Sequence, residues 1–593
     1  MSEQAVAPAP GRVTLGLLGF LGGLSAWLLL EVLPERMQDA PRLMLFLTAF
    51  GAGLFPAALA LAGPLRLGRA LAAAVGLALV LAGLLCWASL RFDTVGEYTA
   101  TGDPWVGFAV LMGLALPFLV AGLGPARRWA DYETLFTQSW LIVVRFSAAW
   151  LFVGLVWGVL FLSNALLELV GIDLIERLMD RQEVPYLLSG LTLGVALAVV
   201  GELSDYVSPD LVLRLLRLLL PVVLVVVVIF LAALPFRGLS NLFGTFSAAA
   251  TLLAMAIGAA TLVSTALDAH DGAAVPCRGP MGWACRLMAL LLPALAALAG
   301  VAIWQRVAQY GLSPDRIIAA ALSILAMGYG LFYALAVLRG AGWGRRIRRA
   351  NVVMALVALA VTAAFFTPLL NPQRLAVANQ VARFAAGKTG VDQLDLWAIG
   401  REWGRAGRDG LARLAALDDH PQAARLAERL AALDAAEGRL AFERVSETDD
   451  AALLKADLAA RLPVRPQGAA LPEGLLDSLR LWELQQIARA CEHRTPRGNP
   501  GCVAVLADFS VQRAGDEVLI LAHNPAGAPL VRAYFRNPDG SGYAMRSPDY
   551  LDGSDFYRAA DDAIDALIAG DYQLAPMRLN ALEVAGRRLF FGR

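Results

Sequence analysis

The sequence predicts an α-helical polytopic membrane protein with about 11 transmembrane helices, followed by a soluble domain in which helical hairpins precede a small α+β unit. Three observations predict this class. The 593 residues are 58% hydrophobic and only 17% charged, with a mean hydropathy of +0.59. Apolar stretches of about 20 residues recur, the length that a helix needs to cross roughly 30 Å of hydrocarbon. After Leu370 the hydropathy falls and does not recover.

The apolar stretches give the predicted spans, and the first one lacks a small-x-small cleavage site, so we interpret it as a span and not as a signal peptide. We expect a multispan membrane domain over 1–370, a soluble helical region over 371–462, a linker over 463–474 and a small α+β domain over 475–593. The predicted spans are Val13–Leu33, Leu43–Ala62, Leu71–Leu90, Trp105–Leu123, Trp140–Leu162, Tyr186–Leu203, Leu211–Leu234, Phe243–Leu267, Trp283–Trp304, Ile317–Leu338 and Val352–Leu370.

The soluble part changes character along its length. Residues 372–462 are rich in Ala, Leu and Arg with helical periodicity and glycine-containing breaks, which is typical of helical hairpins. After a helix around Leu475–Ala490, short β-like runs follow, then a helix and a run with strand-like alternation. The runs predicted as strands are 502–509, 517–523 and 529–536, the helix is 554–570, and the alternating run is 574–591.

The distribution of arginine predicts the orientation, because positively charged loops stay in the cytoplasm. Numbered from the N-terminus, the even loops hold thirteen arginines and the odd loops eight, and GWGRRIRRAN (342–351) carries most of the contrast. Eleven spans and a cytoplasmic N-terminus would place the C-terminal domain in the periplasm, with the membrane domain in a bacterial inner membrane. One miscounted span would reverse this assignment.

Charged residues within the predicted spans are the candidate intramembrane polar site, because a charge facing lipid costs several kcal/mol. Arg145 lies about five residues into the fifth span, and Glu202 and Asp205 lie at the end of the sixth. Arg145 either extends to the interface or pairs with these carboxylates in a polar cavity. Arg214 and Arg217 share a helix face and are alternative partners for the carboxylates, although contact with anionic lipid headgroups also accounts for them.

Two cysteines bracket the loop CEHRTPRGNPGC (491–502). In a periplasmic domain the compartment is oxidising, which favours a disulfide between Cys491 and Cys502. Free thiols and a metal site that includes His493 are the alternatives. We therefore expect a disulfide and no metal.

Signatures of enzymes are missing from the sequence. It contains no HExxH, GxSxG or P-loop pattern, and GKTG (387–390) lacks the upstream glycine of a phosphate loop. The aspartates between 549 and 562 do not match the spacing of a calcium loop. Cys277, Cys285 and His270 offer fewer ligands than a structural zinc site needs. We expect no cofactor, and the enzyme class is the least favoured.

Three stretches resemble a family of bacterial inner-membrane proteins, domain of unknown function 4153. They are TLFTQSWLIVVRFSAAWLFVGLVWGVLFLSNALLELVGI (134–172), LRLLLPVVLVVVVIFLAALPFRGLSNL (216–242) and NPQRLAVANQVARFAAGKTGVDQLDLWAIGREWGRAGRDGLARL (371–414). In the last stretch, GRAGRDG stands at the family's Gly-Arg-x-Gly-like turn and LWAIGREWG replaces the usual aromatic strip. The resemblance covers about residues 13–420 and implies a multipass architecture without an established activity.

Two functions follow as hypotheses. The first is a non-enzymatic inner-membrane protein that presents a periplasmic interaction or sensing module, because surfaces of helical hairpins suit partner binding. The second is a transporter or flippase that moves a small solute or lipid through the membrane domain. The formal net charge of zero argues against nucleic acid, so the expected partners are the lipid bilayer and periplasmic or membrane proteins.

Overall fold

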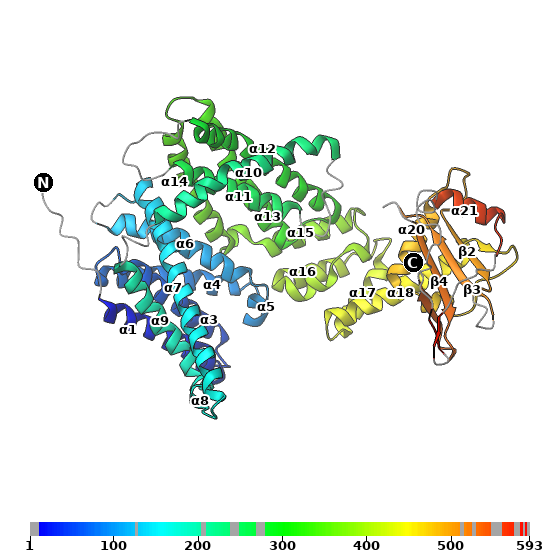
Figure 1. Ribbon diagram of the computed structural model, residues 1–593, viewed down its shortest axis with the longest axis horizontal. Coiled ribbons are helices and arrows are strands. Elements are labelled where there is room, and N and C mark those ends of the chain that lie inside the picture. Colours follow the sequence, from blue (N-terminus) through cyan, green and yellow to red (C-terminus); the bar gives the residue numbers. More distant parts are fainter. Residues whose placement is uncertain are drawn as a thin grey trace. The chain divides into compact units, whose positions relative to one another are not determined.

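The computed structural model divides the chain into two compact units, Met1–Leu430 and Ala431–Arg593. Its labelled elements are drawn in Figure 1. It describes residues 11–124, 128–202, 209–237, 248–267, 279–509, 515–524, 529–546, 560–574, 582–584 and 587–589.

The first unit confirms the polytopic membrane fold. Among the described residues, 11 helices are long and apolar enough to cross a membrane, and each corresponds to one predicted span. The first crossing runs through α1 (Arg12–Trp27), η1 (Leu28–Val32) and α2 (Leu33–Arg36). The others are α3 (Pro41–Leu61), α4 (Leu67–Ser89), α6 (Asp103–Leu123), α7 (Tyr132–Glu168), α9 (Glu183–Glu202), α10 (Pro209–Arg237), α11 (Ala248–Leu267), α12 (Gly279–Tyr310), α13 (Pro314–Leu338) and α14 (Trp343–Phe365), with the short helices α5 (Val95–Ala100) and α8 (Leu174–Met179) between them.

The last membrane helix differs from its predicted bounds. It begins at Trp343, not at Val352, so the GRRIRR arginines form its first turns and are not a loop. Hydropathy detects only the part of a helix that matches the hydrocarbon, and the polar turns that continue beyond it look like loop in the sequence. Arg346 donates hydrogen bonds to the carbonyls of Gly340 and Ala341, both at 2.9 Å. The arginine thereby satisfies backbone acceptors just after the end of α13.

The membrane helices form two clusters, each with its own core. Helices α1, α3, α4, α6, α7 and α9 supply the buried side chains of the first cluster, drawn in blue to turquoise in Figure 1. Helices α10 to α14 supply the second, which includes the fully buried Tyr333, Met288 and Ile347. Because α6 and α7 also pack against α14, the two clusters meet along these three helices.

Glycines allow α1 and α9 to pack with their backbones in contact. A Cβ atom on Gly19 would lie 2.1 Å from the Gly190 carbonyl oxygen, and one on Gly23 would lie 2.2 Å from the Tyr186 carbonyl oxygen. A Cβ on Gly194 would likewise lie 2.1 Å from the Leu15 carbonyl oxygen. Both helices therefore carry the small-xxx-small spacing of close membrane-helix pairs, Gly19/Gly23 on α1 and Gly190/Gly194 on α9.

The region after the last span belongs partly to the first unit. Gln380 of α15 (Pro372–Ala385) donates hydrogen bonds to the carbonyls of Tyr310 and Leu312, between α12 and α13. The amide of Arg405, in α16 (Gly404–Ala415), donates to the carbonyl of Arg91 after α4. The compact unit thus extends to Leu430, beyond the predicted membrane domain of 1–370, and includes part of the predicted soluble helical region. The remaining elements of this stretch are η3 (Pro368–Leu370), η4 (Val391–Gln393), η5 (Ala398–Glu402) and α17 (Ala423–Ala435).

These contacts test the number of spans that separate each loop from residue 371. The loop after α4 and the loop between α12 and α13 both contact α15 or α16, so both lie on the membrane side to which the last span leads. Eight helices cross between the loop after α4 and residue 371, and two cross between the α12–α13 loop and residue 371. Even numbers return the chain to the same side, which agrees with the observed contacts.

An ion-pair cluster ties α16 to the loop after α4. Arg405 Nε lies 2.9 Å from Asp93 Oδ1, and Arg408 also pairs with Asp93. The hydrogen bond from Arg405, together with the charges of both arginines, holds the pKa of Asp93 below its usual value although partial burial raises it. Because the folded-state pKa is lowered, the stabilisation is present above the unfolded-state pKa and is lost as the pH falls through the folded-state pKa.

We expect Asp93→Asn to loosen α16, with a small effect because the pair is exposed. Hydrogen exchange of the α16 amides, corrected for intrinsic rates, should be faster in this variant at pH 7. The wild-type protein should approach the same behaviour only when the pH falls below about 4. Asp409→Asn, an exposed change on α16 itself, is the control, and equal protection in all three proteins would contradict the expectation.

The second unit is built on a five-stranded sheet in the order β1-β2-β3-β4-β5, in which β1 and β2 are parallel and the other neighbours are antiparallel. Side chains alternate between the two faces of the sheet along each strand. Both faces carry buried apolar side chains, and helices cover both. Cys502 and Ala504 face the core made with α18 and α20, whereas Val503 and Val505 face α21. The elements are α18 (Arg439–Arg461), β1 (Val464–Arg465), α19 (Leu475–Ser478), α20 (Leu481–Glu492), β2 (Cys502–Ala507), β3 (Glu517–Ala522), β4 (Leu530–Arg536), β5 (Tyr543–Arg546), α21 (Ala560–Ala569) and the separate hairpin β6 (Leu582–Val584) and β7 (Arg587–Leu589).

The small α+β unit is confirmed, with three differences in detail. The predicted linker 463–474 contains β1, which pairs with β2 and so belongs to the sheet. The helix predicted over Leu475–Ala490 is two helices, α19 and α20, with a break at Leu479 and Arg480. Strand β5 was not predicted, because YAMR lacks a run of apolar residues. Residues 554–559 of the predicted 554–570 helix lie outside the described residues.

Candidate functional site

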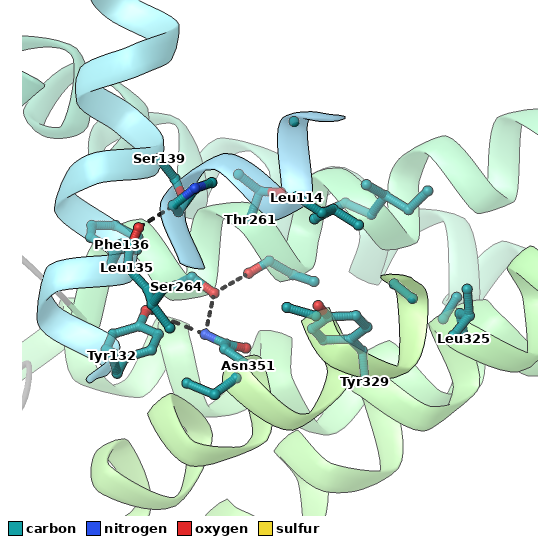
Figure 2. Close-up of a pocket in the computed structure, with 18 of the residues that line it drawn as sticks. Leu114, Tyr132, Leu135, Phe136, Ser139, Thr261, Ser264, Leu325, Tyr329 and Asn351 are labelled. Atoms are coloured by element: carbon teal, nitrogen blue, oxygen red, sulfur yellow. Dashed lines mark hydrogen bonds between the residues drawn. The ribbon is translucent and has the colours of Figure 1, made fainter. Parts of the chain in front are cut away.

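Four polar side chains meet inside the membrane unit, where the two helix clusters adjoin. The Asn351 amide, on α14, donates from Nδ2 to Ser264 Oγ on α11 at 3.1 Å and to the Tyr132 hydroxyl on α7 at 3.3 Å. The Tyr333 hydroxyl, on α13, donates to Asn351 Oδ1 at 2.6 Å and lies 2.7 Å from Ser264 Oγ. Figure 2 shows Asn351, Ser264 and Tyr132 directed toward one another from three different helices.

This polar cluster (Tyr132, Ser264, Tyr333 and Asn351) lies at one end of its helices. Tyr132 is the first residue of α7 and Ser264 lies three residues before the end of α11. Tyr333 lies five residues before the end of α13, and Asn351 lies eight residues after the start of α14. These helix ends all lie on the side of the even loops. In an apolar environment each of these groups needs a hydrogen-bond partner, and together they provide for one another.

A cavity of about 450 Å³ extends from the polar cluster into the unit. Beyond the cluster its walls are mostly apolar, with Ser139, Thr261 and Tyr329 as further polar residues, and include the middle parts of the helices, for example Gly113 on α6, Ala256 on α11 and Ala326 on α13. The volume lies within the range of small-molecule sites. The cavity is therefore polar at one end and apolar at the other, and it fits a molecule with the same division.

A second cavity, of about 830 Å³, lies within the first helix cluster and is lined almost entirely by apolar and glycine residues of α1, α3, α6, α7 and α9. It lacks a comparable hydrogen-bonded cluster among its described lining residues, although Trp157 on α7 donates to Ser189 on α9 nearby. The first cavity is therefore the better candidate for specific recognition.

The described members of the predicted intramembrane polar site do not line the first cavity. The Arg145 guanidinium lies against Gly63 and Gly201 at the ends of α3 and α9, where a Cβ would come within 2.6 and 3.0 Å of its nitrogens. It donates a long hydrogen bond of 3.4 Å to the Leu197 carbonyl. Arg145 therefore lies beside the ends of α3 and α9, and its extension to the interface stays a prediction.

The carboxylate predicted to pair with Arg145 has a different partner. Glu202 forms a salt bridge with Arg12, at 2.6 Å between Oε2 and Nη2, so it joins the ends of α1 and α9 that the glycines bring together. Arg214 is exposed and Arg217 half-buried on α10, and Asp205 lies outside the described residues. Among the described residues, Glu202 thus pairs with Arg12 at the helix ends and not with Arg145.

The polar cluster was missed because each member looks ordinary in the sequence. Asn351 was assigned to the loop before the last span, and the hydroxyl groups of Ser264, Tyr132 and Tyr333 are common near helix ends. The signal that could have revealed Asn351 is its place directly before an apolar run. Its partners come from residues 132, 264 and 333, and their convergence depends on helix packing that the sequence does not display.

In the second unit the disulfide prediction is confirmed. Cys491, at the end of α20, is bonded to Cys502, at the start of β2, and both residues are buried. The bond joins the end of α20 to β2, the first strand of the antiparallel part of the sheet.

Fold and sites together define a polytopic membrane protein that carries a second, α+β unit at its C-terminus. Comparison with known proteins gave no match: no family model matches the chain, and neither a curated protein nor a solved structure does. The resemblance to domain of unknown function 4153 therefore stays a prediction.

Proposed function

We propose that the membrane unit binds an amphipathic, lipid-like molecule in the 450 Å³ cavity and carries it between the membrane leaflets or across the membrane. The one-sided polarity of the cavity supports this most directly. A headgroup with hydrogen-bonding atoms fits the polar cluster, and an acyl or other apolar chain fits the walls near the helix middles. The location where two helix clusters meet suits such a role, because relative movement of the clusters would open the cavity.

The proposed setting is a bacterial inner membrane, with the N-terminus in the cytoplasm and the C-terminal unit in the periplasm. The excess of arginine in the even loops supports this orientation, and the Cys491–Cys502 disulfide supports an oxidising compartment for the second unit. The headgroup end of the cavity would then lie toward the cytoplasmic leaflet.

Two substitutions test the cavity from opposite ends. Asn351→Leu removes the central hydrogen-bonding group of the polar cluster, and Ala358→Phe fills the apolar end without touching that cluster. Each is expected to lower the amount of lipid that copurifies with the full chain by about tenfold, the effect of losing one or two buried hydrogen bonds or an equivalent apolar contact. Native mass spectrometry of the detergent-purified protein measures the bound lipid.

Thr265→Val is the matched control, because Thr265 is buried next to Ser264 but bonds only to the Leu262 carbonyl of its own helix. This variant should keep the bound lipid. Transbilayer movement of a fluorescent lipid in proteoliposomes should fall in the same two variants. If both keep lipid and movement at the level of the control, the proposal is wrong.

A second candidate function, an interaction or sensing module in the periplasm, concerns the C-terminal unit. The separate core and the disulfide of this unit favour a domain that works outside the cytoplasm. A photo-crosslinking residue at Trp482, which is exposed on α20, should give discrete adducts with periplasmic or membrane proteins in cells. The same residue placed at Leu331, exposed on the membrane helix α13, is the control, and identical adduct patterns would contradict an interaction role.

A further inference from the structure

Three metal-ligating side chains converge in the second unit, from segments far apart in the sequence. His493 directly follows α20, His523 directly follows β3, and Asp561 lies in the first turn of α21. His493 Nε2 lies 3.2 Å from Asp561 Oδ2, and His523 Nδ1 lies 2.8 Å from Asp561 Oδ1. The two imidazole rings stack with their centroids 3.6 Å apart.

The backbone holds both histidines in place. The Gly501 amide donates to the His493 carbonyl at 2.8 Å, and the His523 amide donates to the Gly501 carbonyl at 2.7 Å. Gly501 itself is fixed beside the disulfide at Cys502. A Cβ on Gly501 would lie 2.7 Å from the Ala490 carbonyl oxygen and 3.0 Å from the His493 ring, so this close arrangement requires glycine.

The helix that carries the third donor, Asp561, is held by the same loop. Asp565, one turn after Asp561 on α21, accepts hydrogen bonds from Thr495 Oγ1 at 2.6 Å and Asn499 Nδ2 at 2.7 Å. Both donors belong to the segment that the disulfide closes. The donor set is thus positioned by main-chain hydrogen bonds, a disulfide and a buried carboxylate.

The donors match one class of ion. Two imidazoles and one carboxylate suit zinc and neighbouring divalent transition metals, whereas calcium and magnesium prefer oxygen ligands alone. The three ligand atoms lie within 4.8 Å of one another, so a small adjustment brings them to the 2.0–2.2 Å that zinc requires. A cavity of about 600 Å³, lined by both histidines, Gln486, Arg489 and Asn524, adjoins the donors and leaves room for a fourth ligand.

We propose that His493, His523 and Asp561 bind one zinc-class divalent ion, with the fourth position open to water or to a ligand in the adjoining cavity. The side chains are 37%, 22% and 26% exposed. An ion held by three protein ligands keeps one coordination position open, unlike the closed four-ligand sites that hold a fold together. The site is independent of the lipid-binding cavity and would allow the second unit to respond to the metal supply outside the cytoplasm.

Zinc titration of the full chain tests this site. The detergent-purified protein, with a tag free of histidine and after treatment with a chelator, should bind one zinc ion per chain in competition with a chromophoric chelator. His523→Ala and Asp561→Asn should each lower the affinity at least about tenfold, since loss of an outer-shell partner alone costs that much. Cobalt should give the visible absorption of a site with nitrogen and oxygen ligands in the wild-type protein and lose it in both variants.

Two matched controls distinguish this site from other histidines and carboxylates. Asp562→Asn changes the exposed neighbour of Asp561, and His420→Ala removes the histidine that packs on Phe384 in the first unit. Both should bind zinc as the wild type does. An assay of the intact Cys491–Cys502 disulfide in each variant shows whether loss of binding reflects unfolding. If the affinities of His523→Ala and Asp561→Asn equal those of the controls, or if the wild type binds no zinc, the proposal is overturned.

Discussion

Replacing Gly19 by leucine is expected to separate α1 from α9 and to destabilise the membrane unit more than any other single change considered. The Cβ alone would lie 2.1 Å from the Gly190 carbonyl oxygen, and the obstacle is backbone, which cannot rotate away. Overpacking of a well-packed contact costs typically 1–3 kcal/mol, and a clash with backbone belongs at the upper end. The Arg12–Glu202 salt bridge at the end of the same helix pair would be lost with the contact.

This effect is measured as the thermal midpoint of the full chain in detergent. Size-exclusion chromatography after heating gives the fraction of protein that stays folded. Gly76→Leu is the matched control, because Gly76 lies on the membrane helix α4 with open space where its Cβ would be. Gly190→Leu should reproduce the loss, since a Cβ there would meet the Gly19 carbonyl oxygen at 2.3 Å. Equal midpoints for the Gly19 and Gly76 variants would show that the two helices do not pack in this way.

The membrane fold was largely predictable because one physical requirement governs it. Each span needs about 20 apolar residues, and all eleven predicted spans have a counterpart helix. Helix ends were less predictable, as α14 shows: its first turns carry arginines that lie beyond the hydrocarbon but continue the same hydrogen-bonded helix. In the second unit, β2, β3 and β4 were found from their short β-like runs, whereas the two-residue β1 is defined only by its pairing with β2.

The sites were less predictable for a different reason. The glycine spacing of α1 and α9 is visible in the sequence, but nothing there shows that these two helices are partners. Asn351 and its hydroxyl partners become a site only when four helices meet. Likewise His493, His523 and Asp561 are separated by up to 68 residues. By contrast, Cys491 and Cys502 are separated by only 11, and a short loop with prolines and glycines limits the alternatives.

The disulfide gives the second prediction with a large expected effect. Removing it by the double change Cys491→Ala and Cys502→Ala restores the freedom of a short loop in the unfolded chain, which the loop-entropy model equates with about 3 kcal/mol. Exchange of the β2 and β3 amides through opening of the second unit should then accelerate about a hundredfold. Cys86→Ala, a half-buried thiol of the first unit, is the control and should leave these rates unchanged.

The same bond tests the proposed orientation. In intact cells an impermeant maleimide should label neither Cys491 nor Cys502 until an impermeant reductant is added, and peptide mass spectrometry identifies which thiols react. Labelling after that reductant requires that the second unit faces the periplasm, because the reagents do not reach the cytoplasm. Labelling without any reductant would contradict the bond, and labelling only with permeant reagents would place the unit in the cytoplasm. An even number of crossings joins the loop after α4 to residue 371. A cytoplasmic second unit would therefore also place that loop in the cytoplasm, and the N-terminus in the periplasm.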